Sequence, residues 1–131
     1  MSFPRMARFR EIAGLREHLA EIAAPIPLDD GPLAAATGSP LAEPITIGGR
    51  MVGNRFAIHP MEGWDATDDG RPSDTLLRRW RNFGLSGAKL IWGGEAVAVV
   101  PEARANPNQL MAPACGRAGF ETLLTAVKDA H

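Results

Sequence analysis

The chain has 131 residues, a formal net charge of −1, 45% hydrophobic residues and one cysteine. That length suits one modest domain with its own core, or a portion of a larger domain. The charge balance argues against a nucleic-acid partner, and no run approaches the roughly 18–20 apolar residues that span a bilayer. A lone cysteine forms no internal disulfide, which suits a reducing compartment. These features predict a soluble, cytoplasmic protein that binds neither nucleic acid nor membrane.

An amphipathic helix is predicted within residues 1–24. Apolar side chains recur there at steps of three or four, a spacing that places them on one face of a helix. Pro25 ends this pattern, because proline has no backbone N–H for a helix interior. Residues 25–44 are rich in proline, alanine and glycine without periodicity, and we interpret them as a linker. The helix stripe consists of Phe9, Ile12, Leu15, Leu19 and Ile22.

A β-hairpin is predicted directly after the linker. Residues 45–47 and 50–52 are short segments separated by Gly48-Gly49, which supplies the positive φ angles of a two-residue turn. Because an isolated hairpin is only marginally stable, we expect it to cover another part of the structure.

The first of two strand–helix repeats follows the hairpin. An apolar strand over residues 56–58 precedes a polar, glycine-rich loop and a helix predicted over residues 74–83. Ser73 is the expected N-cap, and Asp74 stands in the first turn, where the helix dipole favours a negative charge.

The second repeat begins with a strand predicted over residues 88–92. Gly93-Gly94 interrupts it, and the apolar run over residues 96–100 is expected to resume it. A loop containing Cys115 then leads to a last helix, predicted over residues 119–130.

Apolar strands alternating with amphipathic helices indicate parallel strands. The long polar loops follow the strands, as they do on the catalytic side of a TIM (β/α)8 barrel, which needs roughly 250 residues. We therefore interpret residues 45–131 as about two βα units of such a barrel, and expect the chain to be the N-terminal portion of a longer barrel. Its uncovered apolar faces predict self-association.

Several short motifs, in order along the chain, resemble the opening of the old yellow enzyme family of NADH:flavin oxidoreductases. Each motif is weak alone, but their common order and spacing over residues 41–131 are specific. The motifs are Leu41-Ala42-Glu43-Pro44-Ile45-Thr46-Ile47-Gly48, Asn54-Arg55-Phe56, His59-Pro60-Met61, Asp69-Gly70-Arg71-Pro72-Ser73, Ser86-Gly87-Ala88-Lys89-Leu90-Ile91, Glu95-Ala96-Val97-Ala98-Val99 and Pro101-Glu102-Ala103-Arg104.

The resemblance implies an FMN-dependent barrel enzyme, in which hydride passes from NADH or NADPH through FMN to a small-molecule substrate. It places Pro60 and Met61 against the flavin ring at the end of the first barrel strand. Ala96 falls where a small residue after the second strand lets the ring edge approach. The family's usual catalytic residues match no position here, so we assign none and expect the chain alone to be inactive.

Two positions depart from the family pattern. Glu62 stands where a threonine or cysteine usually lies near the ring, and an ionised carboxylate there would make the flavin harder to reduce. It could equally point into solvent. Trp64 stands in the region that often lines the substrate pocket and is a candidate apolar wall.

A different class of function stays open, in which the chain is a catalytically inert fragment that acts as a structural or interaction piece. The arginines at positions 78, 79 and 81 are interpreted as an exposed helix face, because the net charge does not favour a polyanion. His18 and Glu21 lie one turn apart without further ligands nearby, so we predict no metal site.

Overall fold

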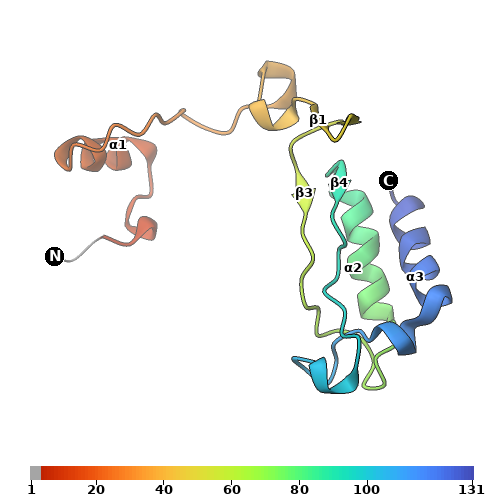
Figure 1. Ribbon diagram of the computed structural model, residues 1–131. Coiled ribbons are helices and arrows are strands. Elements are labelled where there is room, and N and C mark those ends of the chain that lie inside the picture. Colours follow the sequence, from red (N-terminus) through yellow and green to blue (C-terminus); the bar gives the residue numbers. More distant parts are fainter. Residues whose placement is uncertain (1–3) are drawn as a thin grey trace. The chain divides into compact units, whose positions relative to one another are not determined.

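The computed structural model describes residues 4–131, which form two compact units divided between Ser39 and Pro40 (Figure 1). The division falls within the predicted linker. No helix among the described residues is long and apolar enough to cross a membrane.

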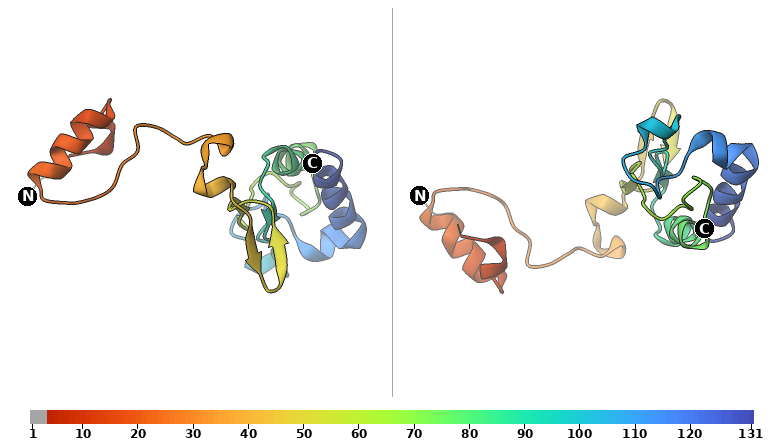
Figure 2. Two further views of the ribbon diagram at one scale, coloured as in Figure 1. Left: turned by 90° about the horizontal axis from the view of Figure 1, so that it is seen from above. Right: turned by 90° about the horizontal axis from the view of Figure 1, so that it is seen from below.

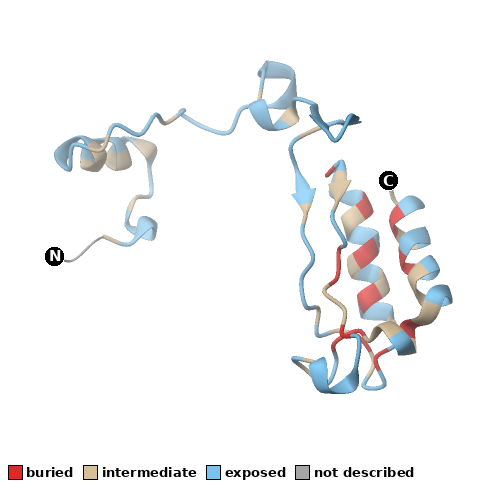
Figure 3. Ribbon diagram, viewed as in Figure 1, coloured by how far each residue is buried: buried red, intermediate tan, exposed pale blue. Residues whose placement is uncertain are grey.

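The first unit contains helix α1 (Ile12–Glu21). Arg16 on this helix donates one hydrogen bond to the carboxylate of Asp30 and one to the carbonyl of Leu28, each at 2.7 Å. These bonds attach the proline-rich segment to the helix. None of the described residues before position 40 is buried, as Figure 3 shows. The predicted helix is therefore present, but its apolar stripe is only partly covered.

The second unit opens with the predicted hairpin of β1 (Ile45–Ile47) and β2 (Arg50–Val52). The strands pair antiparallel, with Ile45 opposite Val52 and Ile47 opposite Arg50. Gly48 and Gly49 between them have φ angles of 55° and 78°, which a side chain would disfavour. The hairpin prediction is confirmed.

Strands β3 (Ala57–Ile58) and β4 (Leu90–Ile91) pair in parallel, in the register Ala57 to Leu90 and Ile58 to Ile91. Helix α2 (Asp74–Leu85) lies between them in the chain. The expected βαβ connection with parallel strands is thus confirmed, although both strands are shorter than predicted. Within the described residues, each strand pair forms its own two-stranded sheet and no barrel is closed.

Helix α2 begins as predicted, because the Ser73 hydroxyl accepts a hydrogen bond from the Leu76 amide at 3.1 Å. It packs side by side with α3 (Ala112–Lys128), as Figures 1 and 2 show. A Cβ on Gly84 would lie 2.4 Å from the carbonyl oxygen of Val127, so this glycine permits the close approach of the two helices. The core residues are Ala66, Leu76, Trp80, Leu110, Cys115, Leu123 and Val127.

Two predictions about the C-terminal part are wrong. Residues 96–100 form no regular strand, because Ala98 instead makes an isolated parallel bridge with Met111. Helical structure also begins at Ala112, well before residue 119, and is broken at Gly116, whose φ is 58° and ψ 178°. Cys115 therefore lies in a buried helical turn and not in a loop. A glycine with a positive φ angle allows this break at low cost.

Candidate functional site

The chain segments that follow β3 and β4 stay side by side beyond the strands. The Trp92 amide donates to the Ile58 carbonyl at 2.8 Å, and the Ala96 amide donates to the Met61 carbonyl at 3.0 Å. The structure therefore brings together Met61 and Ala96, the two positions that the family resemblance assigns to a flavin surface. We call Pro60, Met61, Glu62 and Ala96 the strand-end surface.

Between these two bonds, Gly93 and Gly94 have φ angles of 80° and 65°. A Cβ on Gly93 would lie 3.1 Å from Pro60 Cγ, and one on Gly94 would lie 3.3 Å from Trp80 Cζ2. Both glycines therefore combine a left-handed conformation with a close neighbour. They allow the segment after β4 to turn and meet Met61 again.

The strand-end surface is largely open to solvent. Pro60 and Glu62 are exposed, Met61 is 57% exposed, and Ala96 is half-buried. Trp64, the candidate wall of a substrate pocket, is 62% exposed. Among residues 4–131, no hydrogen bond or ion pair fixes the direction of the exposed Glu62 side chain, so its effect on a flavin stays a prediction.

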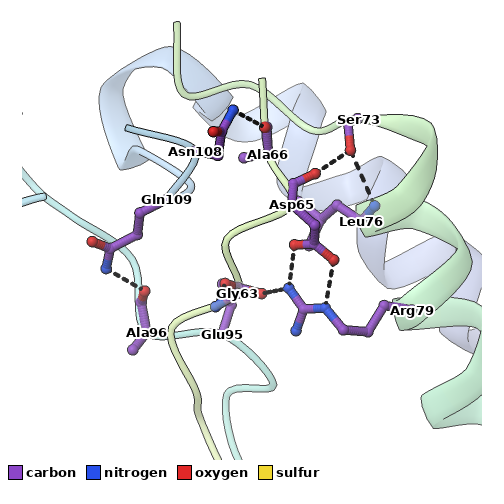
Figure 4. A network of polar contacts seen from close by, with 10 residues as sticks. All are labelled: Gly63, Asp65, Ala66, Ser73, Leu76, Arg79, Glu95, Ala96, Asn108 and Gln109. Atoms are coloured by element: carbon purple, nitrogen blue, oxygen red, sulfur yellow. Dashed lines mark hydrogen bonds and ion pairs between the residues drawn. The ribbon is translucent and has the colours of Figure 1, made fainter. Parts of the chain in front are cut away.

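A network of charged side chains joins α2 to the segments that follow β3 and β4 (Figure 4). Arg79 on α2 donates to Asp65 through both Nε and Nη2, each at 2.8 Å, and through Nη2 to Glu95 at 2.6 Å. The second oxygen of Glu95 accepts a hydrogen bond from the Gly63 amide at 2.8 Å. We call Asp65, Arg79 and Glu95 the Arg79 cluster.

The Arg79 cluster is shielded from solvent. The Glu95 side chain is 1% exposed, and those of Arg79 and Asp65 are 21% and 19% exposed. The hydrogen bonds that Arg79 donates to Asp65, and then the one that it donates to Glu95, raise the pKa of Arg79 against the opposing effect of burial. Arg79 is therefore a fixed positive charge between two carboxylates.

A second set of contacts joins the two loops that follow the strands. Arg104 donates to the carbonyls of Asp68, at 2.7 Å, and of Gln109, at 3.0 Å, and also to that of Pro107. The buried side chain of Gln109 donates to the Ala96 carbonyl at 3.0 Å. Ala96 is thus held through its amide by one loop and through its carbonyl by the other.

The interpretation of Arg79 as part of an exposed helix face is wrong, although Arg78 and Arg81 are exposed. Arg79 follows Leu76 by three residues and precedes Phe83 by four, so it lies on the apolar side of α2. That spacing was the signal in the sequence that Arg79 is not fully exposed. The partners of Arg79, Asp65 and Glu95, follow the two strands, but only the parallel pairing brings them to one place.

Cys115 has no role that the structure supports at this site. It is buried in the first turn of α3, and burial raises the pKa of its thiol. A raised pKa leaves less of the nucleophilic thiolate at neutral pH.

Neither a protein-family model nor a curated protein sequence matches the chain.

Proposed function

We propose that this chain supplies the first two βα units of an FMN-dependent β/α-barrel oxidoreductase. In this proposal the strand-end surface contacts the flavin ring. The observation that carries it is the hydrogen bond from the Ala96 amide to the Met61 carbonyl. It joins, at the C-terminal ends of parallel strands, the two positions that the family resemblance assigns to the ring. Active sites of β/α barrels lie at that end of the strands.

The residues present suit one edge of a flat ring. Met61 offers an exposed thioether side chain, and Ala96 has only a methyl group that leaves room for a ligand. The nearby cations are engaged: Arg79 pairs with two carboxylates and Arg104 with backbone carbonyls. We therefore expect this surface to contact the ring and not the phosphate of FMN.

Bound FMN would supply hydride transfer from NADH or NADPH to a small-molecule acceptor. The chain's own contribution is to bind and orient one edge of the ring. The residues that we assign to the flavin contact do not include a proton donor, so we expect no catalytic turnover from this chain alone.

Tryptophan fluorescence tests this proposal. Trp64 and Trp92 are 62% and 66% exposed in the segments that follow β3 and β4, whereas Trp80 is buried. Adding FMN should quench them with a saturable curve and a Kd weaker than about 100 µM, which corresponds to less than about 5.5 kcal/mol of binding free energy. Riboflavin should bind as well as FMN, because the phosphate has no partner at this surface.

A matched pair of variants provides the control. Met61→Lys places a charge at the strand-end surface and should abolish saturable quenching. Met6→Lys makes the same change at a 67% exposed methionine of the first unit and should leave it intact. Quenching that never saturates, or that is unaffected by Met61→Lys, would refute the proposed flavin contact.

The second candidate function is the inert structural or interaction piece. The observation that favours it is the set of large apolar side chains exposed in the second unit, which predicts association between molecules. This alternative would be supported by protein that is colourless, does not bind added FMN, and sediments as oligomers whose size increases with concentration. These side chains include Phe56, Met61, Trp64, Trp92, Val99 and Val100.

A further inference from the structure

The Arg79 cluster connects the two segments that carry the strand-end surface, because Arg79 bonds to Asp65 in one and to Glu95 in the other. Glu95 directly precedes Ala96, and Gly63 follows Met61 by two residues. The Glu95 carboxylate accepts from the Gly63 amide through one oxygen and from Arg79 through the other, so it connects both segments to α2. Figure 4 shows Arg79 reaching from α2 toward Asp65 and Glu95.

The hydrogen bonds of Arg79 leave no room for a side chain at Gly63. A Cβ at this position would lie 1.8 Å from Arg79 Nη2 and 2.8 Å from Asp65 Oδ1. Any side chain would therefore displace the guanidinium from Asp65 and Glu95. The contacts of Arg79 with Asp65 and Glu95 therefore require that residue 63 has no side chain.

Stability alone is a poor explanation for this arrangement. Burying a carboxylate as deeply as that of Glu95 carries a desolvation cost that an ion pair often only balances. In addition, Arg79 Nη1 is buried without a hydrogen-bond partner among the described residues, which adds a further cost. What the cluster provides is a defined geometry, because the planar guanidinium binds Asp65 in one orientation.

We propose that Arg79 is a positioning residue. By bridging Asp65 and Glu95, it fixes the Gly63 peptide against the segment after β4 and so keeps Met61 and Ala96 facing the same ligand. Its consequence for flavin binding rests on the proposed function. Its effect on the backbone does not.

Amide hydrogen exchange, measured residue by residue by NMR, tests this proposal on the full chain. Arg79→Gln should lower the protection of the Gly63 and Ala96 amides by about ten- to a hundred-fold, the range for hydrogen bonds to charged groups. The amides of Leu76 and Leu123 in the helices should change by less than about two-fold. Arg79→Lys, which keeps the charge without the planar fork, should restore part of the protection.

Arg78→Gln is the matched control, because it removes an exposed arginine from the same helix turn and should change none of these amides. If Arg79→Gln does not fold, Asp65→Asn removes one arm of the cluster and should lower Gly63 protection in the same direction by a smaller factor. The positioning role is overturned if Gly63 keeps its protection, or if Leu123 loses protection in equal measure.

The same variants separate this proposal from the proposed function. Arg79→Gln should weaken the FMN-induced quenching of tryptophan by at least about three-fold, and Arg78→Gln should not. If the unmodified chain binds no FMN, the proposed function fails, while the exchange of Gly63 still decides whether Arg79 positions the backbone. If FMN binds equally well to Arg79→Gln, the link from Arg79 to the flavin surface is refuted.

Discussion

The backbone amide of Ala96 donates a hydrogen bond to the carbonyl of Met61 at 3.0 Å, although the two residues belong to different βα units. Regular pairing of β3 with β4 ends at Ile58 and Ile91, so this bond is a separate contact beyond the strands. It places a small side chain and an exposed methionine next to each other. A flat ligand that contacts one would contact the other.

Enlarging Ala96 should therefore block the surface. We expect Ala96→Phe to weaken FMN binding at least about ten-fold, which equals about 1.4 kcal/mol, while the far-ultraviolet circular dichroism stays unchanged. Ala103→Phe makes the same substitution at an exposed residue of the following loop and serves as control. Equal affinity in Ala96→Phe and the unmodified chain would show that the ring does not approach this residue.

The contact between α2 and α3 at Gly84 makes a prediction about stability. Gly84→Ala should lower the free energy of unfolding by about 1–3 kcal/mol, because its Cβ would lie 2.4 Å from the Val127 carbonyl oxygen. This cost exceeds the gain in helix propensity of up to about 1 kcal/mol. Urea unfolding monitored through the buried Trp80 measures the change.

Gly14→Ala is the matched control for this helix substitution. Its nearest neighbour would be Phe9 Cδ1 at 4.0 Å, an ordinary contact. It should increase the helical circular dichroism slightly and leave the unfolding midpoint reported by Trp80 where it is. A midpoint for Gly84→Ala equal to that of the unmodified chain would contradict the tight packing.

Much of the local structure was predictable because it depends on neighbouring residues. Gly48-Gly49 defines the hairpin turn, and Ser73 caps α2 through an amide three residues away. The parallel pairing of β3 and β4 followed from the alternation of strands and helices. For the turn and the cap, the determining groups lie close together in the sequence. The strand pairing joins distant residues, Ala57 and Leu90, but the order of the elements indicates it.

The Arg79 cluster was not predictable in the same way. The partners of Arg79 are separated from it by 14 and 16 residues, and only the packed βαβ unit brings them together. Arginine is usually exposed, and its position on the apolar side of α2 was the sole local indication. The prediction of a strand over residues 96–100 was wrong for a related reason, since Ala98 bonds to the distant segment of Leu110 and Met111.

Asp69 provides a prediction about pH. A hydrogen bond from the Thr67 hydroxyl, followed by the charge of Arg71, lowers the pKa of this carboxyl below its ordinary value. The ionised form therefore stabilises the folded loop fully above the unfolded-state pKa, and this contribution is lost as the pH falls through the folded-state pKa. Thr67→Val should raise the pKa of Asp69 toward its ordinary value, because the largest cause of the lowering is removed.

An NMR titration of the Asp69 carboxyl measures this shift directly. Thr122→Val is the control, because the Thr122 hydroxyl donates to the Ala118 carbonyl on α3 and should not affect Asp69. An Asp69 carboxyl that titrates at the same pH with and without the Thr67 hydroxyl would show that this bond is not the main cause.

The buried thiol makes a chemical prediction. Burial raises the pKa of Cys115, so it should react with iodoacetamide at neutral pH at least about ten-fold more slowly in the folded chain than in urea. Mass spectrometry of timed samples measures both rates. Similar rates in the two conditions would mean that the first turn of α3 opens readily.

The measurement that tests the central claim most directly is an FMN titration followed through the backbone amide signals of the whole chain by NMR. The account predicts that the signals of Met61, Glu62 and Ala96 shift together along one saturable curve. The amide signals of residues on the exposed faces of α2 and α3 should not shift. Shifts confined to other regions, or none at concentrations far above 100 µM, would contradict the assignment of a flavin surface to these strand ends.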